Sequence, residues 1–279
     1  MTRVEKLAFI GAGSMTEAII CGILKKGFIR PENIFVTNKD NRKRLERLAT
    51  QYNVRCSNDK KETVKDANTI ILAVKPKDAK VAMAAIAPYI DVDQRLISVV
   101  AGVSSDFISR VMEKPVAVIR AMPNTSAAVG KSATAIAPGK YASSEDLQWA
   151  KRLFETIGSV VIVSEDRLHA VTGLSGSGPA YIYYLVESME KAAKDIGLDT
   201  AVARDLVIQT LLGSAEMLKS TKMDAQTLRK QVTSPGGTTQ AGLEVLRKFN
   251  YQEALIACIR RATERSMELG QAYENDTVT

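Results

Sequence analysis

Short apolar runs alternate with amphipathic segments through the first half of the chain. Nearly unbroken Val, Ile and Leu runs predict five strands, at residues 6–10, 33–37, 68–75, 95–102 and 116–124. Segments between them have helical spacing, at residues 14–27, 41–52 and 79–90. Parallel strands covered by helices on both faces require such continuous apolar runs. The alternation therefore predicts an α/β fold whose N-terminal part is a doubly wound, Rossmann-type domain.

The pattern changes after about Val163. Two last strand-like runs occupy residues 132–139 and 159–164, and long helical patterns follow at 178–197, 200–220 and 253–271. We therefore expect residues 1–163 to form the Rossmann domain and residues 164–279 to form an all-helical C-terminal domain.

The predicted helix at residues 179–196 is apolar on most of its circumference. Its apolar positions are Ala180, Ile182, Tyr183, Leu185, Val186, Met189, Ala192 and Ala193. A helix of this kind must be buried on several sides, and the C-terminal domain alone offers few neighbours. A second subunit would supply them, so we expect a homodimer, or a higher multiple of dimers, formed through this domain.

The formal net charge of +7 raises the question of nucleic-acid binding. The basic residues are scattered, however, and aromatic residues make up only 5% of the chain, which leaves few platforms for base stacking. We therefore expect a solvated basic surface and no nucleic-acid partner, although local positive charge can serve a small anionic ligand.

Three cysteines, Cys21, Cys56 and Cys258, lie far apart and lack metal-ligand spacing, which is typical of thiols in a reducing compartment. No other cluster of metal-ligand residue types has the spacing of a metal site. The N-terminus does not resemble a signal peptide, and no stretch approaches the ~20 apolar residues that span a bilayer. The sequence thus predicts a soluble cytoplasmic protein without a membrane or metal partner.

A glycine loop follows the first predicted strand. Gly11 permits a tight turn, and Gly13 lets the backbone approach a pyrophosphate at the N-terminus of the next helix. That helix begins with Ser14 and Met15. The third glycine of the usual fingerprint is replaced by Thr16, and Ala18 and Gly22 are candidates to relieve helix–strand packing instead. The βαβ context favours a dinucleotide site over a plain tight turn.

The end of the second predicted strand indicates which dinucleotide binds. An acidic residue there would hold the ribose 2′-hydroxyl of NAD, but this chain has Asn38 and Lys39, with Arg42 nearby. An amide and cations suit a 2′-phosphate better, so NADPH is favoured. Asp40 is close enough that NADH stays possible.

A second glycine turn, "TSPGGTTQAGLEVL" at residues 233–246, precedes a helical pattern. The glycines Gly236 and Gly237 leave the helix N-terminus without side chains, so its amides can receive a carboxylate, and Thr238 and Thr239 add hydroxyls. The alternative is a simple cap, with Ser234 as N-cap and Pro235 at the first helical position. That alternative leaves the two glycines unexplained, because each costs ~1 kcal/mol of helix propensity.

Two C-terminal motifs together resemble the signature of the pyrroline-5-carboxylate reductase family: "LSGSGPAYIYYLVESM" at residues 174–189 and "VTSPGGTTQAGL" at 232–243. Four further motifs agree in the same order along the chain: "FIGAGSMTEAIICG", "ILAVKPKD", "VVAGVS" and "IRAMPNTSAAVG". Two positions depart from the family pattern. Ser126 stands where the family usually has proline, and Thr238 stands where many members have alanine.

The resemblance implies NAD(P)H-dependent reduction of Δ1-pyrroline-5-carboxylate to L-proline, with a substrate-binding and dimerising helical domain. It implies that the Thr239 hydroxyl contacts the ring nitrogen, and that the turn from Ser234 to Thr238, with the amides around Gly236 and Gly237, holds the carboxylate. It also places Val74, Lys75 and Pro76 beside the nicotinamide, and Asn58 near the adenosine ribose. The hydride chemistry itself belongs to the cofactor.

Two other functions stay open. A β-hydroxyacid-dehydrogenase-like reductase would use a lysine of the second domain, for which Lys191 and Lys194 are candidates by position, but it would leave the second glycine turn unexplained. A non-catalytic NADPH-binding regulator could share the fold. The single histidine, His169, lies in a helical run, where we expect a structural role.

Overall fold

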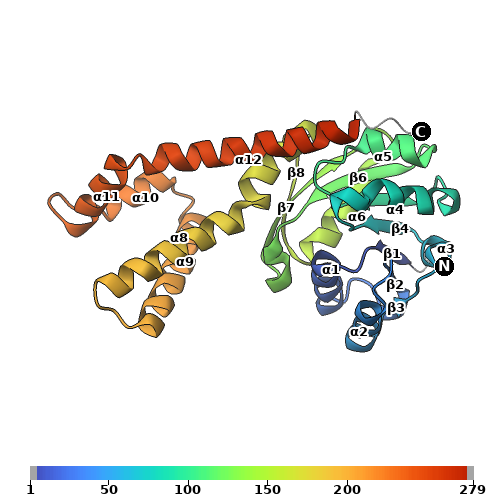
Figure 1. Cartoon of the computed structure of the whole chain (residues 1–279), viewed down its shortest axis with the longest axis horizontal. Helices are drawn as coiled ribbons and strands as arrows, with labels where there is room; N and C mark the ends of the chain where they lie inside the picture. The colour runs from blue at the N-terminus through green and yellow to red at the C-terminus, as the bar shows by residue number, and fades with distance from the viewer. Residues whose placement is uncertain (1–4, 275–279) are drawn as a thin grey trace. The chain divides into compact units, whose positions relative to one another are not determined.

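The computed structural model describes residues 5–274 and contains one eight-stranded sheet (Figure 1). Its strands are β1 (Leu7–Ile10), β2 (Ile34–Thr37), β3 (Arg55–Cys56), β4 (Thr69–Leu72), β5 (Arg95–Ser98), β6 (Ala117–Met122), β7 (Ser132–Pro138) and β8 (Gly158–Ile162). The five main predicted strands and the two later runs are therefore confirmed. The sequence pattern missed β3, which has only two residues.

The strand order is β3-β2-β1-β4-β5-β6-β7-β8, and the pairs from β3 to β6 are parallel. This arrangement confirms the doubly wound α/β fold. Strand β7 is antiparallel to β6, because the chain between them holds only the short helix η4 (Thr125–Val129), and a parallel crossover needs a dozen or more residues.

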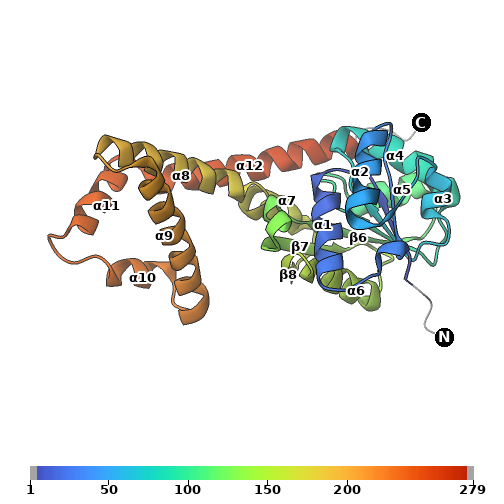
Figure 2. The ribbon, with the colours of Figure 1, turned by 90° about the horizontal axis from the view of Figure 1, so that it is seen from below.

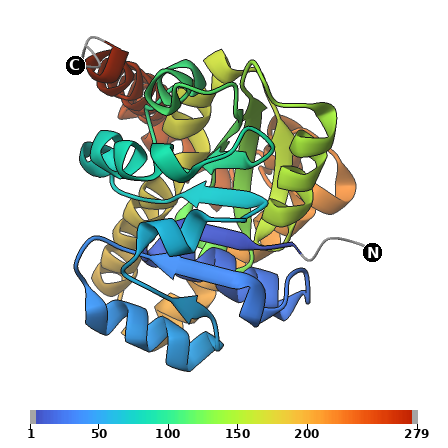
Figure 3. The ribbon, with the colours of Figure 1, turned by 90° about the vertical axis from the view of Figure 1, so that its right-hand side faces the viewer.

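Helices cover both faces of the sheet (Figure 3). One apolar cluster joins the sheet to α1 (Ser14–Lys25), α2 (Arg42–Tyr52) and α6 (Ser144–Glu155), and the other joins it to α3 (Lys60–Val64), α4 (Ala79–Ile86) and α5 (Ser105–Met112). Strands β1 and β4 are buried at every position, as the continuous apolar runs predicted.

The described residues after β8 are mainly helical. After α7 (Leu168–Val171) and a π-helical turn (Thr172–Gly176) come α8 (Gly178–Asp195), α9 (Thr200–Thr221), α10 (Ala225–Gln231), α11 (Thr238–Lys248) and α12 (Tyr251–Glu274). Helices α8 and α9 pack against each other (Figure 2). Within residues 5–274, none of the helices combines the length and the apolar character needed to cross a bilayer.

Contacts divide the chain into two compact units. The sheet unit runs through Ser177 and includes the segment that begins at Arg261, whereas the helical unit is Gly178–Arg260. The predicted division at residue 163 follows the change from strands to helices along the sequence, and it stays a prediction about domain organisation.

The helical unit buries very little of itself. Of residues 178–260, all of which are described, only Ala193, Ala203 and Val207 are buried. Large apolar side chains are exposed instead, including Tyr183, Tyr184, Leu206 and Leu212. An apolar surface of this kind on a folded chain marks a protein–protein contact.

Candidate active site

The strand order reverses between β1 and β4, and a pocket opens at the carboxyl ends of these strands. Its volume is about 640 Å³, and it is lined by the glycine loop, the end of β2 and the segment that follows β4. Ligands of doubly wound proteins bind in the crevice at such a switch point. Of the residues predicted to hold the cofactor, this pocket brings together Gly11, Gly13, Asn38, Lys39, Val74 and Lys75.

The two loop glycines serve different purposes. Gly11 has a φ of +112°, and a Cβ there would lie 2.3 Å from the carbonyl oxygen of Ala73, so no side chain fits between the loop and the end of β4. Gly13 is the N-cap of α1, and a Cβ at this position would meet no protein atom within 4 Å. The space beside Gly13 is therefore left for a ligand, next to the first amides of the helix at Ser14 and Met15.

Thr16 replaces the third fingerprint glycine and stabilises the loop. It is fully buried, and its hydroxyl donates a 2.8 Å hydrogen bond to the carbonyl of Gly11. The close helix packing occurs at Gly22 instead, where a Cβ would lie 2.4 Å from Cγ2 of Ile157 and 2.8 Å from the carbonyl oxygen of Thr156. The sequence-based expectation that Gly22 relieves packing is confirmed, although its neighbour is the segment before β8.

The end of β2 contains an unpaired polar atom. Thr37 lines the pocket and is fully buried, and its hydroxyl has no hydrogen-bond partner within the described part of the chain. A buried hydroxyl in the wall of a pocket is satisfied when a polar ligand binds. The residues present therefore fit a dinucleotide, whose ribose and phosphates offer many partners.

Both polar atoms of the Asn38 side chain bond within the turn before α2. Its Nδ2 donates to the carbonyl of Asn41 at 2.8 Å, and its Oδ1 accepts from the Asn41 amide at 3.1 Å. Asn41 in turn caps α2 by accepting from the amide of Arg44 at 3.0 Å. Asn38 thus shapes the β2–α2 turn that carries Lys39.

The sequence did not predict three cations of this pocket. Arg44, Lys60 and Lys77 line it, whereas Arg42, which the sequence suggested, does not. With the predicted Lys39 and Lys75, cationic side chains outnumber the two carboxylates, Asp40 and Asp78, by three. The surplus suits a ligand with several phosphates.

Asn58, Pro76, Ser14 and Met15 are not among the lining side chains. Asn58 is exposed in the loop between β3 and α3, two residues before Lys60. Pro76 begins the short 3-10 helix η2 (Pro76–Asp78), and Ser14 and Met15 present backbone amides rather than side chains. Their assignment to the cofactor stays a prediction.

The second glycine turn lies in the helical unit and folds as a tight turn before α11. The amide of Gly237 donates to the carbonyl of Ser234 at 3.1 Å, and Gly236 has a φ of +70°. The helix begins at Thr238, and its N-cap is Gly237, with no side chain capping it. The alternative in which Ser234 caps the helix is therefore wrong, because Ser234 lies one turn too early.

The amides at the start of α11 are not equally available. The Gly236 amide donates to Oε1 of Gln240 at 2.9 Å, and the first helical bond runs from the Ala241 amide to the Gly237 carbonyl at 3.2 Å. The amides of Thr238 and Thr239 precede that bond and have no helical carbonyl to reach. Both threonines are exposed. The amides of Gly236 and Gly237 are therefore engaged within the turn, whereas those of Thr238 and Thr239 are left for other partners.

His169 is held within the sheet unit. Its Nδ1 lies 2.9 Å from the hydroxyl of Ser266, and its Cε1 lies 3.1 Å from the position of a Cβ at Gly270. Burial and the charge of Arg120 lower the pKa of His169, although Glu165 opposes them. Through these contacts His169 anchors the last turns of α12. Among the described residues, no three His, Cys, Asp or Glu side chains are grouped as metal ligands would be.

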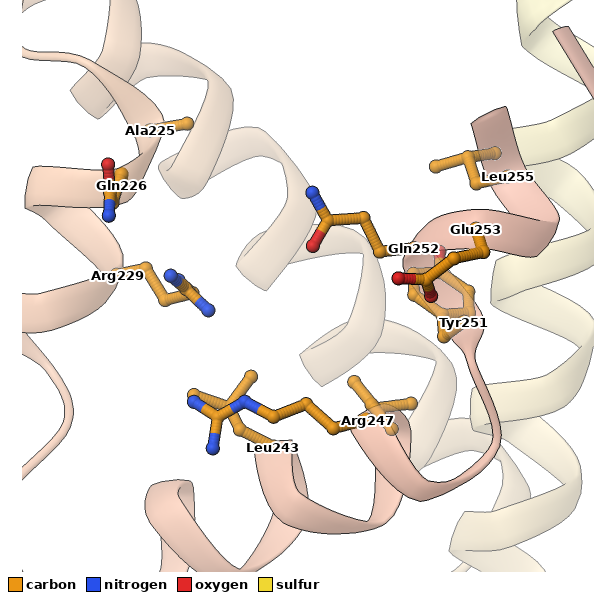
Figure 4. Close-up of a pocket in the computed structure, with 10 residues that line it drawn as sticks. Ala225, Gln226, Arg229, Leu243, Arg247, Tyr251, Gln252, Glu253 and Leu255 are labelled. Carbon is orange, nitrogen blue, oxygen red and sulfur yellow. The ribbon is translucent and has the colours of Figure 1, made fainter. Parts of the chain in front are cut away.

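A second pocket, of about 650 Å³, lies within the helical unit between α10, α11 and the start of α12. Figure 4 shows the side chains of Arg229 and Arg247 extending from α10 and α11 into the space between them. None of the residues from Ser234 to Thr239 lines it. It is therefore distinct from the turn that the sequence identified.

A doubly wound sheet with a glycine loop, an unpaired hydroxyl and excess positive charge at its switch point defines a Rossmann-type, dinucleotide-binding protein. Two family models agree with this class. Residues 6–102 match the model described as NADP oxidoreductase, coenzyme F420-dependent, and residues 165–269 match pyrroline-5-carboxylate reductase dimerisation.

Relatives cover almost the whole chain. It is 47% identical over 270 residues to pyrroline-5-carboxylate reductase 2 of Bacillus subtilis, with 97% of each chain covered, and 36% identical over 269 residues to pyrroline-5-carboxylate reductase of Staphylococcus aureus, with 96% and 99% covered. A pyrroline-5-carboxylate reductase structure from Coxiella burnetii aligns with a TM-score of 0.88 at 32% identity, over 96% of this chain and 99% of that one. A Plasmodium falciparum structure with NADP bound aligns with a TM-score of 0.87 at 28% identity, over 95% and 98%. The chain belongs to the pyrroline-5-carboxylate reductase family.

Proposed function

We propose that this chain reduces Δ1-pyrroline-5-carboxylate to L-proline with NADPH as the hydride donor. The observation that carries this proposal is the combination, in one chain, of the phosphate-binding pocket at the switch point and the glycine turn before α11, within a family whose members carry that name. The reaction adds a hydride to the imine carbon and leaves the ring nitrogen as a secondary amine.

The second glycine turn supplies the groups that such a substrate needs. The amides of Thr238 and Thr239 stand at the positive end of the α11 dipole, where a carboxylate is stabilised. The exposed Thr239 hydroxyl can donate to or accept from the ring nitrogen. An imine that enters already protonated is a good hydride acceptor and carries the proton that the amine nitrogen keeps, so a hydroxyl that orients the ring is enough and no strong general acid is required.

NADPH, when bound, supplies the hydride, and the sheet unit holds it. The amides at Gly13, Ser14 and Met15 would hold the pyrophosphate, and Lys39, which lines the pocket on the β2–α2 turn, would pair with the 2′-phosphate. Val74 and Lys75, with Pro76 next to them, follow β4 and would flank the nicotinamide. No acidic side chain ends β2 at Thr37 and Asn38, and the carboxylate of Asp40, which also lines the pocket, is outnumbered by cations, so NADPH is favoured over NADH.

A homo-oligomer is the functional form. The dimerisation model covers residues 165–269, and the exposed apolar side chains of α8 and α9 lie in the same range. We place the protein in the cytoplasm. Three free thiols, at Cys21, Cys56 and Cys258, are consistent with a reducing compartment.

The decisive measurement is NADPH oxidation by the purified protein with Δ1-pyrroline-5-carboxylate, followed by detection of proline. We expect turnover with this imine, a higher kcat/KM with NADPH than with NADH, and no turnover with β-hydroxyacids and NADP⁺. Turnover with a β-hydroxyacid instead would favour the alternative reductase. NADPH binding without turnover of any of these compounds would favour a regulator, and either result would overturn the proposal.

A further inference from the structure

An acidic side chain lies in the first turn of the helix that starts at the phosphate-binding loop. Glu17 is the fourth residue of α1, and its amide makes the first helical bond, to the carbonyl of Gly13 at 3.1 Å. A carboxylate here competes with a bound phosphate for the positive end of the helix and repels it. The chain therefore needs a device that neutralises Glu17 and directs it away from the ligand.

Helix α2 supplies that device. Arg44 Nη2 lies 2.6 Å from Oε2 of Glu17, Arg47 Nη2 also lies 2.6 Å from the same oxygen, and the Tyr52 hydroxyl donates to Oε1 at 3.1 Å. Burial opposes ionisation of Glu17, but the hydrogen bonds from Arg44 and Tyr52 and the two guanidinium charges outweigh it. The pKa of Glu17 is consequently lower than usual, and the carboxylate is charged and paired.

Arg44 differs from Arg47 because it also reaches the backbone of the glycine loop. Its Nε donates to the carbonyl of Ala12 at 2.7 Å, and its Nη2 donates to the carbonyl of Gly13 at 3.3 Å. The side chain of Arg44 is 19% exposed and lines the cofactor pocket, whereas that of Arg47 is 54% exposed and does not line it.

The contact with these two carbonyls determines where the next two amides point. In a trans peptide the C=O and the following N–H point in opposite directions. Holding the Ala12 carbonyl on Arg44 therefore directs the Gly13 N–H away from Arg44, and holding the Gly13 carbonyl does the same for the Ser14 N–H. Gly13 has no side chain that could restrict this rotation, so an external anchor matters more here than in an ordinary turn.

We propose that Arg44 is a positioning residue for the cofactor diphosphate: its guanidinium anchors the carbonyls of Ala12 and Gly13, so that the loop amides face the ligand, and it neutralises Glu17. The proposal rests on the NADPH dependence proposed above. The diphosphate is common to NADPH and NADH, so this role is independent of the 2′-phosphate.

The test measures cofactor binding without turnover, by titrating the full-length protein with NADPH and with NADH and following the nicotinamide fluorescence. Arg44→Gln should weaken both cofactors by the same factor, about tenfold or more, since bonds from a charged donor are lost. The matched control is Arg47→Gln, which removes a partner of Glu17 without touching the loop, and both affinities should stay within about twofold of wild type.

Two further variants separate anchoring from charge. Arg44→Lys keeps the charge but cannot supply both donors of the fork, so its affinity should fall between wild type and Arg44→Gln. In the double variant Glu17→Gln/Arg44→Gln the repulsion is removed but the carbonyls stay unanchored, so binding should recover only in part. Thermal unfolding checks that each variant folds. If Arg44→Gln does not fold, Arg44→Lys takes its place in the binding test.

Three outcomes would overturn the proposal. A loss confined to NADPH would make Arg44 a direct ligand of the 2′-phosphate. Complete recovery in the double variant would reduce its role to neutralising Glu17. Unchanged binding in Arg44→Gln, or in Arg44→Lys where only that variant folds, would leave it a structural link between α1 and α2. Absence of NADPH binding in the wild-type protein would instead refute the proposed function, which keeps the two failures distinct.

Discussion

Thr239 stands at the second residue of α11, where a hydroxyl and a free helix amide belong to the same exposed residue. Thr239→Val keeps the shape of the side chain and removes its hydroxyl. If that hydroxyl binds the ring nitrogen more strongly as the charge on the nitrogen changes during hydride transfer, kcat should fall in the variant by roughly 10- to 100-fold, equivalent to ~1–3 kcal/mol. Steady-state kinetics with saturating NADPH measure this loss.

Two comparisons make the Thr239 result specific. Thr239→Ser retains a hydroxyl and should recover most of the lost kcat, and NADPH affinity should be the same in all three proteins, because the phosphates bind at the other glycine loop. A valine variant with wild-type kcat and KM would show that the turn is only a helix start.

Single positions also explain how this chain departs from the usual Rossmann fingerprint. Thr16 holds the loop through its hydroxyl, and Gly22 provides the close approach that the third glycine provides elsewhere. Ser126, which replaces the usual family proline, uses an amide that proline lacks: it donates to Oδ1 of Asn124 at 3.1 Å. The Asn124 Nδ2 then donates to the carbonyl of Ser175 at 3.0 Å, which ties η4 to the π-helical turn.

At the scale of elements, α1 is the helix that connects the cofactor loop to the rest of the sheet unit. Gly22→Ala would place a methyl 2.4 Å from Ile157 and 2.8 Å from the Thr156 carbonyl oxygen, so either α1 or the segment before β8 must shift. We expect a loss of stability of about 1–3 kcal/mol, as is usual for overpacking, and a lower unfolding temperature in thermal denaturation.

The matched control for this substitution lies on another helix. Gly242 is inside α11, and a Cβ there would meet nothing within 4 Å. Gly242→Ala should therefore be neutral or stabilising by up to ~1 kcal/mol through helix propensity. Equal unfolding temperatures for Gly22→Ala and wild type would show that α1 moves freely against the segment before β8, contrary to the packing described.

At the scale of the whole molecule, the helical unit requires a partner because it leaves its apolar side chains exposed. Tyr184 on α8 is 72% exposed, and Tyr184→Glu would place a charge in the expected contact. Burying an unpaired charge is costly, so light scattering should show a smaller assembly or a dimer that dissociates at higher concentration than wild type.

Val129, in η4 of the sheet unit, is the control for surface charge, since it is 75% exposed and lies outside residues 165–269, the range of the dimerisation model. Val129→Glu should leave the assembly unchanged. A wild-type protein that is monodisperse, monomeric and active at the assay concentration would contradict the oligomer.

Local signals in the sequence determined the strands, the two glycine turns and the helical character of the C-terminal part. Continuous apolar runs encode burial on both faces of a sheet, and glycines mark positions where the backbone must be approached closely. For the same reason the predicted β1, β2, β4, β5 and β6 are all present, and Gly11 and Gly13 lie in one pocket. Helices α5 and α6 are amphipathic, but the sequence pattern did not predict them, because the apolar runs of the neighbouring strands are stronger signals.

The tertiary structure alone decided which charged side chains reach the cofactor pocket. Arg42 and Arg44 are both arginines in the first turn of α2, and the sequence does not distinguish them. Only Arg44 lines the pocket, and it contacts residues 12 and 13, far away along the chain. Lys60 lines the pocket although no signal in the sequence indicated it, whereas Asn58, two residues earlier, is exposed and is not among the lining side chains. Long side chains are placed by the packing of whole elements, and periodicity along the chain carries no information about that packing.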